Sequence, residues 1–161
     1  DPHYRSLLGF AQLIEKMWIG FGHQFALRTA QAHVNTLDNE HCLVFLMFLD
    51  CVFQLMNQFQ NAFEFNQNLL VAIMDAVFHC RFATFLADSY QQRESLLQVH
   101  KNKLISFWEY VFAEKDQFLN RSSSSSSLSL EIVLLPTPSK VTCWERYFLR
   151  VQPNQTYPFF I

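Results

Sequence analysis

Glycine is scarce in this sequence, at 3 residues of 161. Glycine provides the positive backbone angles of tight turns and lets the backbone approach a phosphate closely. Neither a GxGxxG pattern nor a GxxxxGK run followed by Ser or Thr occurs, so we expect no nucleotide loop and no cofactor. With 50% hydrophobic residues, the chain has enough apolar mass for one core. The composition therefore favours helices over hairpins.

Charge is also sparse. Asp, Glu, Lys and Arg make up 16% of the residues, and the formal net charge is -2. A nucleic-acid-binding domain usually carries a clear excess of Lys and Arg. Nucleic acid is therefore not an expected partner, and individual arginines have to meet any anionic ligand.

The cysteines form no CxxC pair, and their wide spacing is typical of a reduced cytosolic protein. A cysteine nucleophile for phosphate esters needs an arginine six positions later, so that loop amides and a guanidinium surround one phosphate. Phe, Asn, Leu and Leu stand at that distance, and we expect no catalytic residue in this chain. His33, His41 and Cys42 lack any zinc spacing, so we also expect no metal site. The cysteines are Cys42, Cys51, Cys80 and Cys143.

The chain opens with Asp1-Pro2-His3-Tyr4-Arg5, without an initiator Met or a signal-peptide pattern. This opening indicates a piece of a longer protein. The most apolar stretch, Leu43–Phe59, contains Asp50 and falls short of the ~20 apolar residues that a membrane span requires. Because it is apolar nearly all round, we expect a core helix with neighbours on several sides. We expect some of those neighbours to come from outside this chain, so residues 1–161 alone are predicted to be poorly stable.

Apolar residues recur at helical spacing along most of the chain. From Ser6 to Trp18 the spacing predicts a helix that Ser6 caps and that Gly20 and Gly22 end. Its expected buried stripe comprises Leu7, Phe10, Leu13, Ile14 and Met17. A helix capped by Asn66 and running to about Cys80 is expected to bury Leu69, Leu70, Ile73, Met74, Val77 and Phe78, with Asp75 opposite. Shorter helices are expected at 24–32, at 107–112, and after Asp88 or Ser89 through Arg93, while His23 and His79 are expected to be packed structural histidines.

Low-complexity and proline-containing segments divide the chain. Residues 1–121 are interpreted as part of one domain, and the serine run 122–127 as a linker. Residues 128–151 are expected to add the last strand, Leu128–Leu135, and a last amphipathic helix, Lys140–Arg150, to the same domain. That helix is expected to use Val141, Trp144, Tyr147 and Phe148. Residues 33–41 and 96–103 are interpreted as loops, and 152–161 as an irregular tail.

Several short stretches of residues, in the same order along the chain, resemble the segment that follows the catalytic loop in the myotubularin family of phosphoinositide phosphatases. The resemblance is specific over residues 1–93 and patchier at 107–120 and 144–150. The matching stretches are Asp1–Phe10, Leu13–Lys16, Trp18, Phe21–His23, Val44–Leu46, Phe48–Val52, Gln58-Phe59, Ala62–Asn66, Thr84–Leu86 and Gln91–Arg93.

This resemblance implies a mainly α chain, the helical C-terminal portion of an incomplete α/β Cys-dependent phosphatase domain. It implies that the nucleophile, the phosphate-binding arginine and the acid precede Asp1, together with a membrane-binding PH-GRAM domain. The family removes the 3-phosphate from phosphatidylinositol 3-phosphate and 3,5-bisphosphate through a cysteinyl-phosphate. Its implied partners are other myotubularin-family proteins and phosphoinositide membranes, and its implied location is the cytoplasm, peripheral at endosomal membranes.

The resemblance also implies a substrate-binding pair in this chain. Active members place two basic residues one helical turn apart after a Gly-His dipeptide. The matching positions here are Gln24 and Arg28. Spacing i, i+4 puts both on one face, as two cations that grip one ligand require. Gln24 offers hydrogen bonds but no charge, and losing a charge-assisted contact costs roughly 1.5–3 kcal/mol in binding.

Three functions stay open at this point. The Gln24 departure and the words at 22–25, 30–31 and 144–150 are similar to a catalytically inactive branch, which favours a pseudophosphatase that binds and regulates active 3-phosphatases. A working 3-phosphatase that tolerates Gln24 is the second hypothesis. A helical protein-interaction module outside the family is the third.

Overall fold

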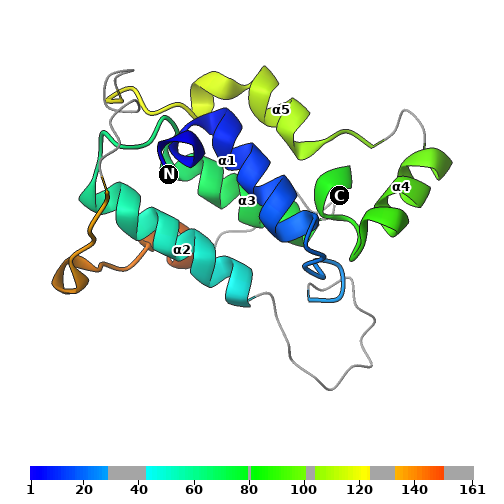
Figure 1. The fold of residues 1–161 in the computed structure, drawn as a ribbon, viewed down its shortest axis with the longest axis horizontal. Helices are drawn as coiled ribbons and strands as arrows, with labels where there is room; N and C mark the ends of the chain where they lie inside the picture. The colour runs from blue at the N-terminus through cyan, green and yellow to red at the C-terminus, as the bar shows by residue number, and fades with distance from the viewer. Residues whose placement is uncertain (29–42, 80, 101–103, 124–132, 151–161) are drawn as a thin grey trace.

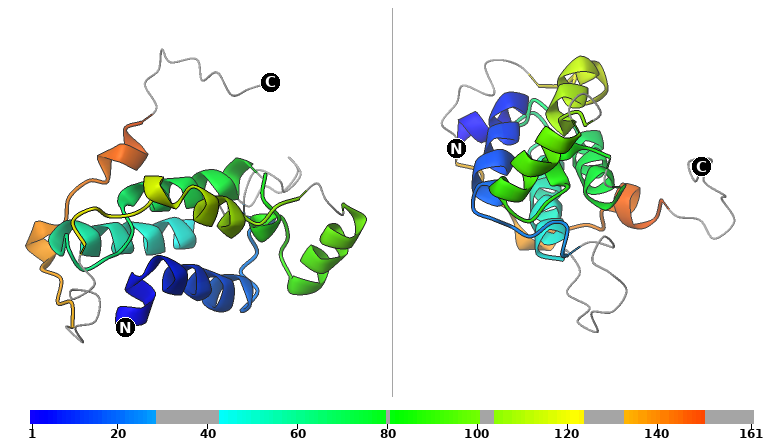
Figure 2. Two further views of the ribbon diagram at one scale, coloured as in Figure 1. Left: turned by 90° about the horizontal axis from the view of Figure 1, so that it is seen from above. Right: turned by 90° about the vertical axis from the view of Figure 1, so that its right-hand side faces the viewer.

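The computed structural model describes residues 1–28, 43–79, 81–100, 104–123 and 133–150 (Figure 1). Within these ranges the chain is mainly α, as the sequence predicts, and extended pairing is limited to an isolated bridge between Phe65 and Leu119. Three helical rods, α1 with η2, α2 and α3, run along the long axis and cluster when viewed end-on (Figure 2). The elements are η1 (Pro2–Arg5), α1 (Leu7–Leu13), η2 (Ile14–Ile19), α2 (Leu43–Gln58), α3 (Gln67–His79), η3 (Ala83–Phe85), α4 (Tyr90–Val99), α5 (Phe107–Ala113), η4 (Lys115–Gln117), η5 (Pro138–Lys140) and α7 (Glu145–Phe148).

The first predicted helix forms, but its second half is a π-helix. Ser6 caps α1, since its hydroxyl accepts a hydrogen bond from the Gly9 amide at 3.0 Å. From Ile14 the chain continues as η2, and the Gly20 amide donates to Glu15 O at 2.8 Å, five residues back. This wider turn brings Ile19 beneath Ile14 in place of Met17. The predicted burial of Met17 is therefore wrong, because its side chain is 49% exposed while Ile19 is buried.

Phenylalanine rings from α1, α2, η3 and α5, and from the segments around Phe25 and Phe65, meet in the core. Phe25 packs against Phe45 of α2 with ring centroids 4.9 Å apart and against Phe85 of η3 at 5.2 Å. Phe10 of α1 meets Phe65 at 4.6 Å, and Phe107 of α5 meets Phe85 at 5.7 Å. These tilted and edge-on contacts are the favoured arrangements of aromatic pairs. Many of the phenylalanines in the sequence thus pack together in one shared core.

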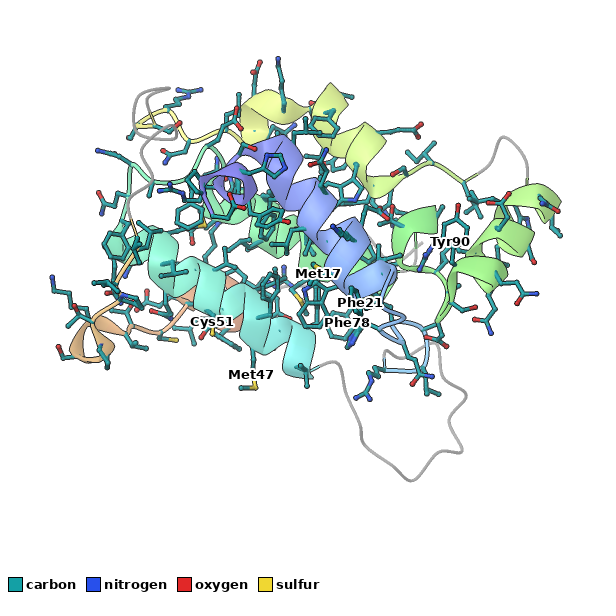
Figure 3. The ribbon with its side chains drawn as sticks, in the orientation of Figure 1. Met17, Phe21, Met47, Cys51, Phe78 and Tyr90 are labelled. Atoms are coloured by element: carbon teal, nitrogen blue, oxygen red, sulfur yellow. The ribbon has the colours of Figure 1, made fainter. Side chains whose placement is uncertain are left out.

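Helix α2 occupies the predicted place but is covered on fewer sides than expected. Phe45 packs on Trp18 of η2 at 4.8 Å, and Phe53 stacks on Trp144 at 5.3 Å. Val44 is 58% exposed and Met47 66%, and Cys51 is also exposed, which is the i, i+3, i+7 face of the helix. Met47 and Cys51 lie on the side of α2 that faces away from α1 (Figure 3).

Helix α3 begins where the sequence predicts, because the Asn66 side chain accepts from the Asn68 amide at 2.8 Å. Five of its six predicted stripe residues are buried together with Ala76. The prediction fails for Phe78, which is 39% exposed because the buried face turns towards Ala76. Asp75 lies away from the core as expected and forms an ion pair with Arg150 at 2.6 Å. The buried residues are Leu69, Leu70, Ile73, Met74, Ala76 and Val77.

Two later helices begin close to their predicted positions, and one is longer than predicted. Ser89 caps α4 through the Gln92 amide at 3.2 Å, so Asp88 is not the cap, and the helix extends beyond Arg93 to Val99. The predicted loop is therefore wrong over 96–99. Helix α5 starts with a capping box between Ser106 and Glu109.

The last predicted strand and helix are wrong where the structure describes them. Residues 133–135 have no regular structure, and only Glu145–Phe148 forms a short helix, α7. Prolines 136 and 138 remove backbone donors on either side of Thr137. Trp144 is fully buried, whereas Val141 and Phe148 are exposed. His79 is also exposed, against expectation, with its Nδ1 at 2.8 Å from Asp75 O.

Some predictions lie outside the described residues. These are the loop 33–41, the metal candidates His33, His41 and Cys42, part of the helix at 24–32, most of the serine linker, the strand over 128–132 and the tail. In the part that the structure describes, no helix is long and apolar enough to span a membrane.

Candidate functional site

The pair predicted from the family, Gln24 and Arg28, lies in a turn directly after η2, which we call the 24–28 turn. Gly22 has φ 81°, a conformation that glycine adopts without strain, and it directs the chain out of the π-helix. The Arg28 amide donates to Gln24 O at 3.1 Å, so one helical turn separates the two residues. The helix expected at 24–32 is absent in its described part, where a hydrogen-bonded turn replaces it.

The core anchors this turn at its middle. Phe25 is fully buried between Phe45 and Phe85. Gln24 is exposed, and Arg28 is half-buried. The two polar residues thus flank an anchored aromatic residue, with Gln24 at the surface and Arg28 partly buried. Their contact with a ligand stays a prediction.

Sequence reasoning missed Asp88, which it considered only as a helix cap. The Asp88 carboxylate accepts a hydrogen bond from the Leu27 amide at 3.0 Å, across sixty-one residues of sequence. Its own amide donates to Gln92 Oε1 at 3.2 Å, so the first turn of α4 holds Asp88 in place. The only signal in the sequence was the acidic residue before the Ser89 cap, and pairing it with Leu27 requires the tertiary fold.

His23 stands between the turn and the core. Its ring lies 4.9 Å from Trp18 and 4.7 Å from Phe25, both edge-on, so the expectation of a packed histidine is confirmed. Burial, and next the charge of Arg28, lower the pKa of His23, while the carboxylate of Asp88 raises it. The balance keeps the ring neutral at neutral pH, because its pKa falls below the ordinary 6.5.

A polar cluster ties η2, α4 and α5 together beneath the turn. Trp108 Nε1 donates to Glu15 Oε1 at 2.9 Å, and Arg93 Nη2 donates to Ala87 O at 3.4 Å. Arg93 is 8% exposed, and its Nε has no hydrogen-bond partner among the described residues. Burial of its carboxylate raises the pKa of Glu15, opposed by the Trp108 hydrogen bond and by the charge of Arg93. The opposite charges of Glu15 and Arg93 thus act between η2 and α4, the helix that begins two residues after Asp88.

An open depression of about 490 Å³ lies between the 24–28 turn and α4. Its lining is mostly apolar with a few amide and hydroxyl groups, so it suits an uncharged part of a ligand more than a phosphate. The lining residues are Ala26, Leu86, Ala87, Gln91, Gln92, Ser95, Leu96 and Val99. Chemically, the turn and this depression offer binding groups, namely a guanidinium and several amides.

The described residues include no cluster of three metal-binding side chains. Two thiols, Cys51 and Cys143, are free and exposed. Neither has an arginine six positions later in the sequence.

Comparison with known proteins identifies the family. The sequence profile of the myotubularin-like phosphatase domain matches residues 1–94. The chain is 40% identical over 158 residues to phosphatidylinositol-3,5-bisphosphate 3-phosphatase MTMR2 of Gallus gallus, covering 96% of this chain and 26% of that protein. It is 38% identical over 156 residues to myotubularin of Rattus norvegicus, covering 96% of this chain and 25% of that protein. The chain thus spans about a quarter of the length of these relatives. It belongs to the myotubularin-related family and corresponds to a helical part of the phosphoinositide phosphatase domain.

Proposed function

We propose that this chain is the helical scaffold of a myotubularin-related pseudophosphatase, which binds active phosphatidylinositol 3-phosphate and 3,5-bisphosphate 3-phosphatases and regulates them. The observation that carries the proposal is Gln24 in the 24–28 turn. In active members of the family this position and that of Arg28 are both basic. Here the turn keeps one cation of the pair.

The consequence for binding follows from the chemistry of the two side chains. A guanidinium makes charge-assisted, bidentate hydrogen bonds to phosphate, whereas an amide makes neutral ones. Replacing one charged contact costs roughly 1.5–3 kcal/mol, or about one to two orders of magnitude in affinity. A turn weakened to this degree suits a protein that no longer has to turn over its lipid.

The alternative is part of an active 3-phosphatase, and the names of the relatives favour it. The Gallus gallus and Mus musculus proteins, each 40% identical to the chain, are named as phosphatidylinositol-3,5-bisphosphate 3-phosphatases. An active enzyme with Gln24 would bind the 3,5-bisphosphate less tightly than a relative with two cations. Family membership leaves an interaction module outside any phosphatase family without support.

The test uses the complete protein that carries this chain. Phosphate release is measured from vesicles that contain phosphatidylinositol 3-phosphate or 3,5-bisphosphate, with the complete protein alone, with an active relative alone, and with both. We expect no release by the complete protein alone and faster release by the mixture. Release by the complete protein alone at a rate comparable with the active relative would support the alternative.

A second measurement addresses the turn itself. Gln24→Arg in the complete protein is expected to raise binding to 3,5-bisphosphate vesicles about tenfold or more, because it restores a charge-assisted contact. Gln98→Arg, the same change on the exposed surface of α4, is the control and is expected to change binding less. Equal gains in both variants would mean that the turn has no special role.

The partners and the location belong to the same proposal. We expect the complete protein to form homodimers or heterodimers with other myotubularin-family proteins and to attach peripherally to endosomal membranes from the cytoplasm. Co-purification of a tagged complete protein with an active family member, together with microscopy against an endosomal marker, tests both statements. A uniformly cytosolic, monomeric protein would contradict them.

A further inference from the structure

The 24–28 turn has a carboxylate built against it. Asp88 accepts from the amide of Leu27, the residue next to Arg28. The Ser89 cap and the Gln92 side chain fix Asp88 at the start of α4. A carboxylate that accepts from the residue next to Arg28 is expected to have two effects. It orders the backbone of the turn, and it lowers the local positive potential.

Among the described residues, charges of both signs lie near the 24–28 turn. Arg28 and Asp88 both act electrostatically on the His23 ring, which is itself neutral at neutral pH. Gln24 adds no charge. Among the described residues, Arg28 and Asp88 thus bring charges of opposite sign to the turn, where the resemblance implies two cations.

The other charges near Asp88 do not remove this effect. Asp88 also acts on Arg93, but Glu15 and then Tyr90 act on Arg93 more strongly. Arg93 thus has its main counter-charge in Glu15, in the cluster beneath the turn. The cation next to the hydrogen-bond donor of Asp88, Leu27, is Arg28.

We propose that Asp88 is a specificity-determining residue of the 24–28 turn: it fixes the turn through the Leu27 amide and offsets the charge of Arg28, so that the turn binds an anionic inositol headgroup only weakly. This inference rests on the proposed headgroup role of the turn. It adds a second cause of weak binding besides Gln24, and this cause lies on a different helix.

The test compares variants of the complete protein on phosphatidylcholine vesicles with and without phosphatidylinositol 3,5-bisphosphate. Asp88→Asn keeps an oxygen acceptor for the Leu27 amide and removes the charge, so the affinity is expected to rise about fivefold. Asp88→Ala removes the acceptor as well and is expected to gain less, because the turn loses its tether. Asp116→Asn, the same change on exposed η4, is the control and is expected to leave the affinity unchanged. Inorganic phosphate as competitor separates free-phosphate binding from headgroup binding.

A spectroscopic readout tests the charge effect without a ligand. Asp88 raises the pKa of His23, so Asp88→Asn is expected to lower that pKa further in an NMR titration, whereas Asp116→Asn leaves it unchanged. An unchanged affinity and an unchanged His23 pKa in Asp88→Asn would overturn the inference.

The result for Arg28→Ala separates this inference from the proposed function. If Arg28→Ala weakens vesicle binding and Asp88→Asn has no effect, the headgroup role stands and only the role of Asp88 is wrong. If Arg28→Ala leaves binding to 3,5-bisphosphate vesicles unchanged, the headgroup role of the turn itself fails.

Discussion

The three-helix core is stabilised mainly by buried apolar side chains, whereas the C-terminal segment, residues 133–150, is fixed largely by hydrogen bonds. In the core, side chains from α1, η2, α2 and α3 are buried against one another over many aromatic contacts. Among the described residues of the C-terminal segment, one side chain, Trp144, is fully buried. The 3-10 helix η5 of this segment lies at the opposite end of the long axis from α4 (Figures 1 and 2).

Besides Trp144, hydrogen bonds from polar side chains of α2 hold the C-terminal segment in place. The Gln54 side chain of α2 donates to Thr142 O at 2.7 Å and accepts from the Thr142 amide at 3.1 Å. Gln58 accepts from the Thr137 amide at 2.7 Å. Side-chain amides of a helix thus replace the strand partner that an irregular segment lacks. The difference shows that a segment with little apolar burial can still be fixed at particular residues.

The largest expected effect breaks the core. Phe45→Ala removes a fully buried ring that contacts Trp18 and Phe25, and it is expected to lower the free energy of unfolding by about 3–5 kcal/mol. Urea denaturation of the chain, followed by circular dichroism, measures this change. Met47→Ala, two residues along the same helix and 66% exposed, is the control and is expected to cost less than about 1 kcal/mol. Similar losses in the two variants would mean that α2 has no distinct buried face.

The second prediction removes the aromatic anchor of the C-terminal segment. Trp144→Ala is expected to cost about 3 kcal/mol and to release residues 133–150, measured as faster amide exchange in that segment only. Trp144→Phe is expected to be much milder, because Trp144 Nε1 is buried without a hydrogen-bond partner among the described residues. Phe148→Ala, in the same segment and exposed, serves as control. Core amides that exchange equally fast in Trp144→Ala would contradict a separately held segment.

The third prediction removes the polar anchor. Gln54→Ala leaves both backbone groups of Thr142 without their partner and is expected to cost about 1–3 kcal/mol. Asn57→Ala removes one exposed contact to the Thr142 hydroxyl and is expected to cost less than about 1 kcal/mol. Urea midpoints of the two variants, measured side by side, rank the contacts. A larger loss for Asn57→Ala would reverse our ranking.

The smallest expected effect concerns pH and the edge of the core. The pKa of His23 is lowered from 6.5, so the folded state binds its proton less readily than the unfolded state. The stabilising contribution is therefore fully present above the unfolded value and is lost as the pH falls through the lower folded value. The urea midpoint of the chain is expected to fall over that range, and to fall less in His23→Gln. An equal fall in both would place this pH dependence at a group other than His23.

Glu15 has the opposite sign and can be told apart. Burial raises its pKa from 4.5, so its contribution is present below that value and is lost as the pH rises through the raised folded pKa. A Glu15→Gln variant that flattens the profile in this direction separates the two groups.

Local signals predicted much of the helical framework. Ser6, Asn66 and Ser89 were predicted to begin helices and do so, because a short polar side chain satisfies first-turn amides within a few residues of sequence. The predictions fail where contacts with residues distant in sequence, or a change of helix type, determine the local structure. Met17 is exposed because a π-turn shifts the buried face, and Lys140–Arg150 stays mostly irregular because Gln54 satisfies the backbone of Thr142.

The candidate site divides in the same way. The sequence by itself determined the family and the i, i+4 spacing of Gln24 and Arg28, since these depend only on which residues follow one another. The tertiary structure alone decided that Asp88 accepts from Leu27 and that Glu15, Arg93 and Trp108 form one cluster. Hydrogen bonds and charges act over a few ångströms in space, and residues far apart along the chain come within that distance only after the aromatic core has packed.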